Sequence, residues 1–177
     1  FLVSLFLLQP AFSEMTAGVA KAVITNAEPL VMVNGNVSSG TLFDLYTRVL
    51  VLNDGAGRMV FVANDLNCLD VATPILRERL QKELGIAPER LIILATHNHS
   101  APIQIVPDNF EYGKRLAEII FTTIQEAIAN EKGPVKLLLG SGEGDFLTCM
   151  GSDVIDKEVQ LLQVKHGEET IAMLFTH

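Results

Sequence analysis

Short apolar runs separated by turn-forming residues dominate this chain and predict β-strands. The runs cover residues 19–24, 45–52, 59–63, 91–95, 135–139, 158–165 and 170–175. The turn residues at 53–57 predict a hairpin between the second and third runs, and those at 166–168 predict another between the last two. The run at 91–95 is apolar throughout, so we expect both faces of that strand to be covered.

Two other segments have the periodicity of amphipathic helices. Leu76, Leu80 and Leu84 recur at every fourth position after Pro74, and Gly85 is the residue type expected just past a helix end. Residues 109–130 form a longer pattern that stops before Gly133 and a proline. Residues 25–40 are rich in Asn, Gly, Ser and Pro and predict a loop, and loops of this length are often functional.

Hairpins combined with two such helices predict an α/β domain with one or more mixed, largely antiparallel sheets flanked by amphipathic helices. The last apolar run stops directly before His177, so we expect the domain to be incomplete at the C-terminus. The glycine-rich residues 140–144 lack the Lys-Ser/Thr ending of a phosphate-binding loop, and we expect a turn there.

Composition narrows the class of protein. The 177 residues are 49% hydrophobic and carry a net charge of −8. This indicates a folded domain and argues against a nucleic-acid binder, which needs a basic surface. Residues 1–13 resemble the end of a secretory signal peptide, which predicts a secreted or periplasmic protein; the alternative is an N-terminal strand or helix of the fold. Cys68 and Cys149 match no zinc-finger spacing.

The candidate chemistry lies in His97 and His99, directly after the apolar run at 91–95. In an extended backbone, residues two apart point to the same side, so both imidazoles could meet one ion or one substrate. Ligand-binding residues of α/β proteins commonly follow a buried strand in this way. Thr96 and Ser100 could orient the rings. The alternative is a pair of partly exposed loop histidines.

Three other side chains bear on this site. His177 also ends an apolar run and is a candidate further ligand, whereas His166 lies in a polar turn and is expected to face solvent. Asp65 ends the run at 59–63 and could be a ligand, although a strand-end turn residue is the better interpretation.

A family resemblance rests on four segments that occur in order, residues 17–25, 45–54, 60–66 and 94–102. Together they resemble the N-terminal part of the neutral/alkaline, non-lysosomal ceramidases, whose signature is Thr-His-Thr-His-Ser-Gly-Pro. The signature here reads Thr-His-Asn-His-Ser-Ala-Pro at residues 96–102. The resemblance covers nearly all of residues 17–177 and implies that residues 14–177 are part of a ceramidase-like zinc hydrolase domain.

The resemblance also implies a function. It makes the protein a secreted, zinc-dependent amidohydrolase of N-acylsphingosine or a related N-acyl lipid, which would meet its substrate at a membrane surface. It assigns His97 and His177 to zinc and His99 to catalysis beside the substrate. The family's other ligands, a Glu and a Tyr, lie later in its sequence, so this segment alone is expected to be inactive.

The chain departs from the family pattern at several positions. Asn98 replaces Thr and Ala101 replaces Gly in the signature. Residues 148–152 contain no Arg, whereas the family has an Arg there that reaches the substrate. Two alternatives therefore stay open: an exported, non-catalytic domain that keeps the fold and binds a ligand, and a zinc esterase or other hydrolase on the same scaffold.

Overall fold

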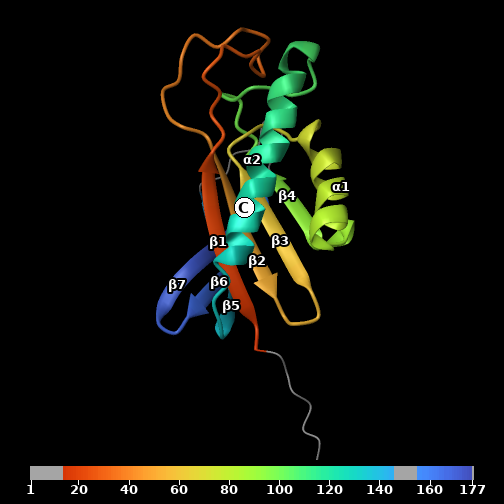
Figure 1. The fold of residues 1–177 in the computed structure, drawn as a ribbon. Helices are drawn as coiled ribbons and strands as arrows, with labels where there is room; N and C mark the ends of the chain where they lie inside the picture. Colours follow the sequence, from red (N-terminus) through yellow and green to blue (C-terminus); the bar gives the residue numbers. More distant parts are fainter. Residues whose placement is uncertain (1–13, 146–154, 177) are drawn as a thin grey trace, which may run out of the picture.

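The first of two β-sheets contains four strands in the order β1-β2-β3-β4 (Figure 1). Its strands are β1 (Thr16–Val23), β2 (Tyr46–Asn53), β3 (Arg58–Asn64) and β4 (Leu91–Ala95). The pairs β1–β2 and β2–β3 are antiparallel, which confirms the predicted hairpin, whereas β4 joins β3 in parallel after a helical crossover. This computed structural model describes residues 14–145 and 155–176.

The second sheet contains β5 (Val135–Glu143), β6 (Glu158–His166) and β7 (Glu169–Thr176), and all its pairs are antiparallel. The hairpin predicted at residues 166–168 is confirmed, with Gly167 at a φ of 58°. The predicted turn at 140–144 is wrong over most of its length. Residues as far as Glu143 continue β5, because pairing with β6 satisfies their backbone hydrogen bonds. His166 ends β6 and is half-buried, so its assignment to a solvated turn is wrong too.

Two helices cover one face of the first sheet (Figure 1). Helix α1 (Ala72–Leu84) ends at Gly85, which is left-handed with a φ of 65°, and α2 is Phe110–Ala129. Single helical turns at Pro88–Arg90 and Pro107–Asn109 precede β4 and α2. The main core lies between the helices and the sheet, and its fully buried side chains include Val51, Val60, Val62, Leu76, Leu116, Ile120 and Ile124.

The second sheet packs against the other face of the first sheet, near the start of β1. A smaller cluster of buried side chains joins them, formed by Ala17, Leu50, Val135 and Val164. Among the described residues, Val23 at the other end of β1 is 46% exposed. The expectation that both faces of β4 are covered is therefore wrong: β4 is an edge strand, and Leu94 is 48% exposed.

The architecture confirms the predicted class, a mixed α/β fold with largely antiparallel sheets and amphipathic helices. Among the described residues, both sheets are open. The predicted signal-peptide segment, residues 1–13, lies outside the described residues, as do 146–154 and His177. Within the described parts of the chain, no helix is both long and apolar enough to cross a membrane.

Candidate functional site

The two histidines of the signature lie together in a turn directly after β4. Their ring centroids are 4.8 Å apart, and the ring planes are inclined by 58°. Both side chains are exposed. Two adjacent, accessible imidazoles can bind a metal ion or exchange protons with a bound ligand.

The backbone of this turn differs from the extended chain expected from the sequence. His97 has a φ of 57°, in the left-handed region, which is uncommon for a residue with a side chain. The rings do approach one another, as expected, but they do so because the chain turns at His97. The premise of an extended His-x-His segment is wrong.

Asp65 does not point toward the histidines as a free ligand. Its Oδ1 accepts a hydrogen bond from Arg48 Nη1 at 2.8 Å, and its Oδ2 accepts one from the backbone N–H of Tyr46 at 3.0 Å. Both carboxylate oxygens are thus engaged with β2. The structure favours the role of a strand-end turn residue over that of a metal ligand.

The hydroxyl groups that were expected to orient the rings do not do so. In the part of the chain that the structure describes, Thr96 and Ser100 take part in hydrogen bonds through their backbone N–H groups. The backbone and the side chain of Asn98 hold the turn instead. Its N–H donates to the Leu66 carbonyl at 3.0 Å. Its side chain donates to the Asp65 carbonyl and accepts from the N–H of Ser100.

Among the described residues, no group of three or more His, Cys, Asp or Glu side chains could hold a metal ion. His97 and His99 alone are fewer than the three or four ligands of a typical protein zinc site. His177, the further ligand assigned from the sequence, lies outside the described residues.

Two other reactive side chains are poorly suited to catalysis. Burial, with a hydrogen bond to Asp70, raises the pKa of Cys68 to about 11, so the thiol stays protonated at neutral pH. Burial raises the pKa of Tyr112 to about 12, and its hydroxyl donates to the Ile24 carbonyl. Cys149 lies outside the described residues.

The long predicted loop lies beside the histidine turn. Val33 donates its N–H to the Ala101 carbonyl, and Ile103 donates to the Val31 carbonyl. The buried Asn109 stabilises the contact between these two segments. Its Nδ2 donates to the carbonyls of Val31 at 2.8 Å and Ile103 at 2.6 Å. The roles of Asn98 and Asn109 were not predicted from the sequence. For Asn98 the sequence does contain a signal, because an asparagine followed two residues later by a serine is compatible with an Asx turn.

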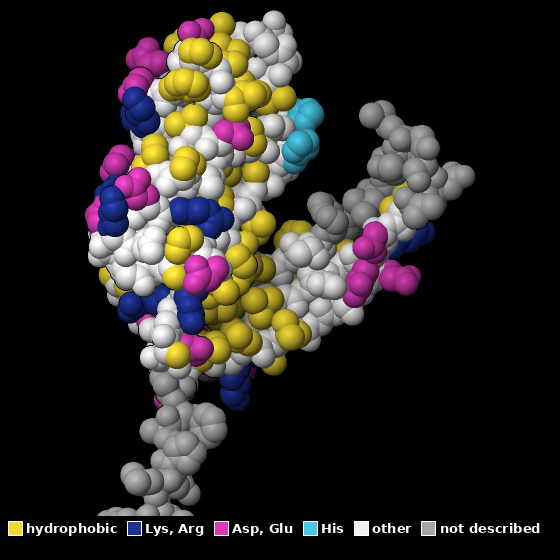
Figure 2. Space-filling view, turned by 90° about the vertical axis from the view of Figure 1, so that its right-hand side faces the viewer, with side chains coloured by type: hydrophobic (Ala, Val, Ile, Leu, Met, Phe, Trp, Pro, Cys, Tyr) yellow, Lys and Arg dark blue, Asp and Glu magenta, His cyan; other side chains and the backbone are white. Residues whose placement is uncertain are grey.

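Histidine side chains lie on the surface of the main body. Figure 2 shows histidine side chains at the edge of the main body, facing a wide space that separates it from the second sheet. Apolar side chains gather where the two parts meet, consistent with the smaller buried cluster.

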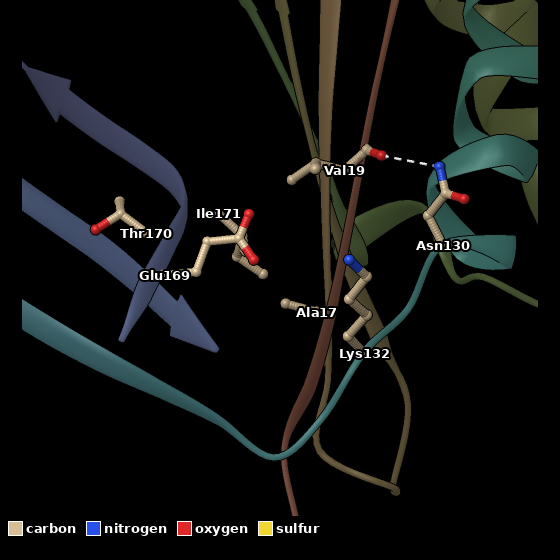
Figure 3. Close-up of a pocket in the computed structure, with 7 residues that line it drawn as sticks. All are labelled: Ala17, Val19, Asn130, Lys132, Glu169, Thr170 and Ile171. Atoms are coloured by element: carbon tan, nitrogen blue, oxygen red, sulfur yellow. Dashed lines mark hydrogen bonds between the residues drawn. The ribbon is translucent and has the colours of Figure 1, made fainter. Parts of the chain in front are cut away.

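A separate pocket of about 380 Å³ lies at the opposite end of the first sheet. It is lined by side chains of β1, the residues after α2 and the start of β7, including Ala17, Lys132 and Glu169 (Figure 3). Asn130 closes one side by donating from Nδ2 to the Val19 carbonyl at 3.2 Å. The pocket belongs to the junction of the two sheets and does not include the histidines.

No family model matches this chain, and no curated protein matches it. Among solved structures, the neutral ceramidase from Pseudomonas aeruginosa matches 92% of this chain with a TM-score of 0.73 at 22% identity. A ceramidase complexed with C2 matches 92% with a TM-score of 0.75 at 22% identity.

The chain has the fold of a part of these ceramidases, which confirms the structural side of the resemblance seen in the sequence. It spans only 31% of the first of these structures and 30% of the second.

Proposed function

We propose that this chain supplies part of the active site of a zinc-dependent amidohydrolase of the neutral ceramidase type. The observation that carries the proposal is the exposed His97–His99 pair, placed after β4 in a fold shared with ceramidase over 92% of the chain. The signature at residues 96–102 connects that fold to the ceramidase motif. The substrate class is an N-acyl lipid amide, such as an N-acylsphingosine.

The donor set of this turn suits zinc. Imidazole nitrogen is a common zinc ligand at about 2.0–2.1 Å, and both rings here are accessible. We assign His97 to the metal together with His177, and the other ligands to residues outside the described chain. Zinc, when bound, acts as a Lewis acid on an amide carbonyl and supplies hydroxide at neutral pH.

His99 faces the substrate in this proposal. An imidazole changes its charge near neutral pH, so it can accept a proton from a nucleophile and return one to a leaving amine. The His99 ring has solvent access for this role. The half-buried Asn98 between the two histidines bonds to backbone and takes no part in proton transfer.

The first test is metal content. In the protein that carries this chain, we expect one zinc ion per molecule, falling below about a tenth of that in His97→Ala because loss of a ligand typically weakens binding by orders of magnitude. His166→Ala is the matched control, since His166 ends β6 away from the turn, and it should keep its zinc. Metal analysis by mass spectrometry distinguishes them, and equal zinc in both variants would refute the assignment.

The second test is the reaction. We expect hydrolysis of a fluorescent N-acyl sphingosine that a zinc chelator abolishes, and His99→Ala should lower kcat by about 10²–10⁴-fold, the usual contribution of a general acid or base. Cleavage of esters but not of amides would favour a zinc esterase. No cleavage of either, with the lipid still bound, would favour a non-catalytic binding domain.

We further propose that the protein is exported, on the basis of the apolar segment at residues 1–13. N-terminal sequencing of the mature protein should find its first residue near position 14. A mature protein that retains residues 1–13 would contradict this proposal.

A further inference from the structure

The turn that carries the histidines has a backbone that must be held in place. His97 is the one non-glycine residue with a positive φ among the described residues. The left-handed conformation costs an L-residue roughly 1–2 kcal/mol. Such a conformation persists only where surrounding contacts over-determine it.

Two backbone hydrogen bonds enclose His97. The N–H of Thr96 donates to the Asn64 carbonyl at 3.0 Å, and the N–H of Asn98 donates to the Leu66 carbonyl at 3.0 Å. Both acceptors belong to the end of β3 and the residues that follow it. The chain is therefore fixed on either side of His97, but these bonds leave His99 unrestrained.

The side chain of Asn98 adds a restraint next to His99, beside the bond from the Val33 N–H to the Ala101 carbonyl at 3.4 Å. Its Nδ2 donates to the Asp65 carbonyl at 3.4 Å, and its Oδ1 accepts from the N–H of Ser100 at 2.8 Å. It is half-buried, whereas both neighbouring histidines are exposed. One side chain thus connects the end of β3 to the residue after His99.

The backbone to which Asn98 bonds is itself anchored. Asp65 donates its N–H to the Tyr46 carbonyl at 2.9 Å, and its carboxylate accepts from Tyr46 N–H and from Arg48. Movement of the Asp65 carbonyl would require these bonds to β2 to break. The restraint on the histidine turn therefore extends to the start of β2, an inner strand of the first sheet.

We propose that Asn98 is a positioning residue that sets the distance and inclination of the His97 and His99 rings. The effect of Asn98 on metal binding and catalysis rests on the proposed function, because a metal ligand and a proton-transfer group need a fixed separation. The geometric part, the dependence of the ring pair on Asn98, stands on the hydrogen bonds alone.

The test compares Asn98→Ala, Asn98→Asp and a control, Asn34→Ala, in this chain. Asn34 Oδ1 accepts from the N–H of Asn36 at 3.0 Å, so it makes the same local turn in an exposed loop. The readout is the nuclear Overhauser effect between the His97 and His99 ring protons, whose rings lie 4.8 Å apart by centroid. We expect this effect to be lost in Asn98→Ala and retained in Asn34→Ala.

Asn98→Asp keeps an acceptor for Ser100 but replaces the Nδ2 donor with an oxygen beside the Asp65 carbonyl. We expect a weakened ring–ring effect in this variant, with far-ultraviolet circular dichroism unchanged. An undiminished effect in both Asn98 variants would overturn the proposal.

Zinc titration of the same variants, made in the protein that carries this chain, separates this inference from the proposed function. In the protein that carries this chain, Asn98→Ala should lower zinc affinity by about 10–100-fold, the range typical for groups that orient metal ligands. If wild type binds no zinc while the ring–ring effect is still lost in Asn98→Ala, the proposed function fails and the positioning role stands. If zinc binds and the effect persists, the positioning role fails and the proposed function stands.

Discussion

At the scale of a single residue, the partly buried carboxylate of Glu131 connects side chains from β1, β2 and β3. Its carboxylate accepts hydrogen bonds from Arg58 at 2.6 Å, Thr16 at 2.9 Å and Asn53 at 3.1 Å, and its side chain is 13% exposed. Burial raises the pKa of Glu131, but these hydrogen bonds outweigh burial, and the pKa lies below the ordinary 4.5. The group therefore stabilises the fold in its ionised form.

Replacement of this carboxylate should reduce stability in a pH-dependent way. We expect Glu131→Gln to lower the free energy of unfolding at pH 7 by roughly 1.5–3 kcal/mol, since the lost bonds involve charged groups. A depressed folded-state pKa contributes stability that is present above the unfolded value of 4.5 and is lost as pH falls through the folded value. The difference between wild type and variant should therefore shrink below pH 4.5, as measured by urea unfolding at pH 7 and pH 3.

Glu118→Gln is the matched control for this measurement. Glu118 pairs with Arg79 through a side chain that is 66% exposed, and exposed pairs contribute about 1 kcal/mol or less. An equal loss in the two variants, or a difference that grows at low pH, would contradict the structural role of Glu131.

At the scale of an element, the contact between β1 and α2 depends on a glycine. A Cβ added to Gly18 would lie 1.9 Å from the backbone carbonyl oxygen of Ala127, near the end of α2. The helix can approach the sheet this closely only because β1 has no side chain there. Asn130 and Lys132 extend the contact through hydrogen bonds to Val19 and Ala17.

Gly18→Ala should therefore displace α2 from the sheet. We expect a loss of roughly 1–3 kcal/mol or more in the free energy of unfolding, the usual range for overpacking a well-packed site. Gly140→Ala is a suitable comparison in another strand, because a Cβ there would meet nothing within 4 Å. Thermal and denaturant unfolding of both variants tests this, and a change within about 0.5 kcal/mol for Gly18→Ala would contradict the close approach.

At the scale of the whole molecule, the two sheets differ in how many of their side chains are buried, although neighbouring strands are hydrogen-bonded in both. Both faces of the four-stranded sheet contribute to buried clusters, whereas in β5 only Val135 is buried. Large apolar side chains on the second sheet are exposed, among them Leu139 at 84% and Phe175 at 68%. The second sheet therefore has less apolar contact to hold its hydrogen bonds closed.

This difference should appear in amide hydrogen exchange. Strands β2 and β6 are the central strands of their sheets, so the comparison between them holds backbone pairing constant. We expect the amides of β2 to exchange more slowly than those of β6, because local opening requires less free energy where few apolar contacts are buried. Equal protection of the two strands, measured by mass spectrometry, would contradict this account.

Much of the fold was determined by local patterns in the sequence. Alternating or continuous apolar runs placed every strand to within a few residues, and Gly85 and Gly167 marked turns that need a positive φ. The histidine motif and its place after a strand were also visible, because residue type and spacing are local properties. The order of four short segments was enough to indicate the ceramidase fold.

Tertiary structure decided which neighbours each segment meets. It placed β4 at a sheet edge, prolonged β5 by pairing it with β6, and directed Asp65 toward Arg48 instead of the histidines. It also turned His97 into the left-handed region through bonds to residues some thirty positions earlier in the chain. These outcomes depend on contacts between distant residues, and a pattern read along the chain carries no information about which distant groups come together.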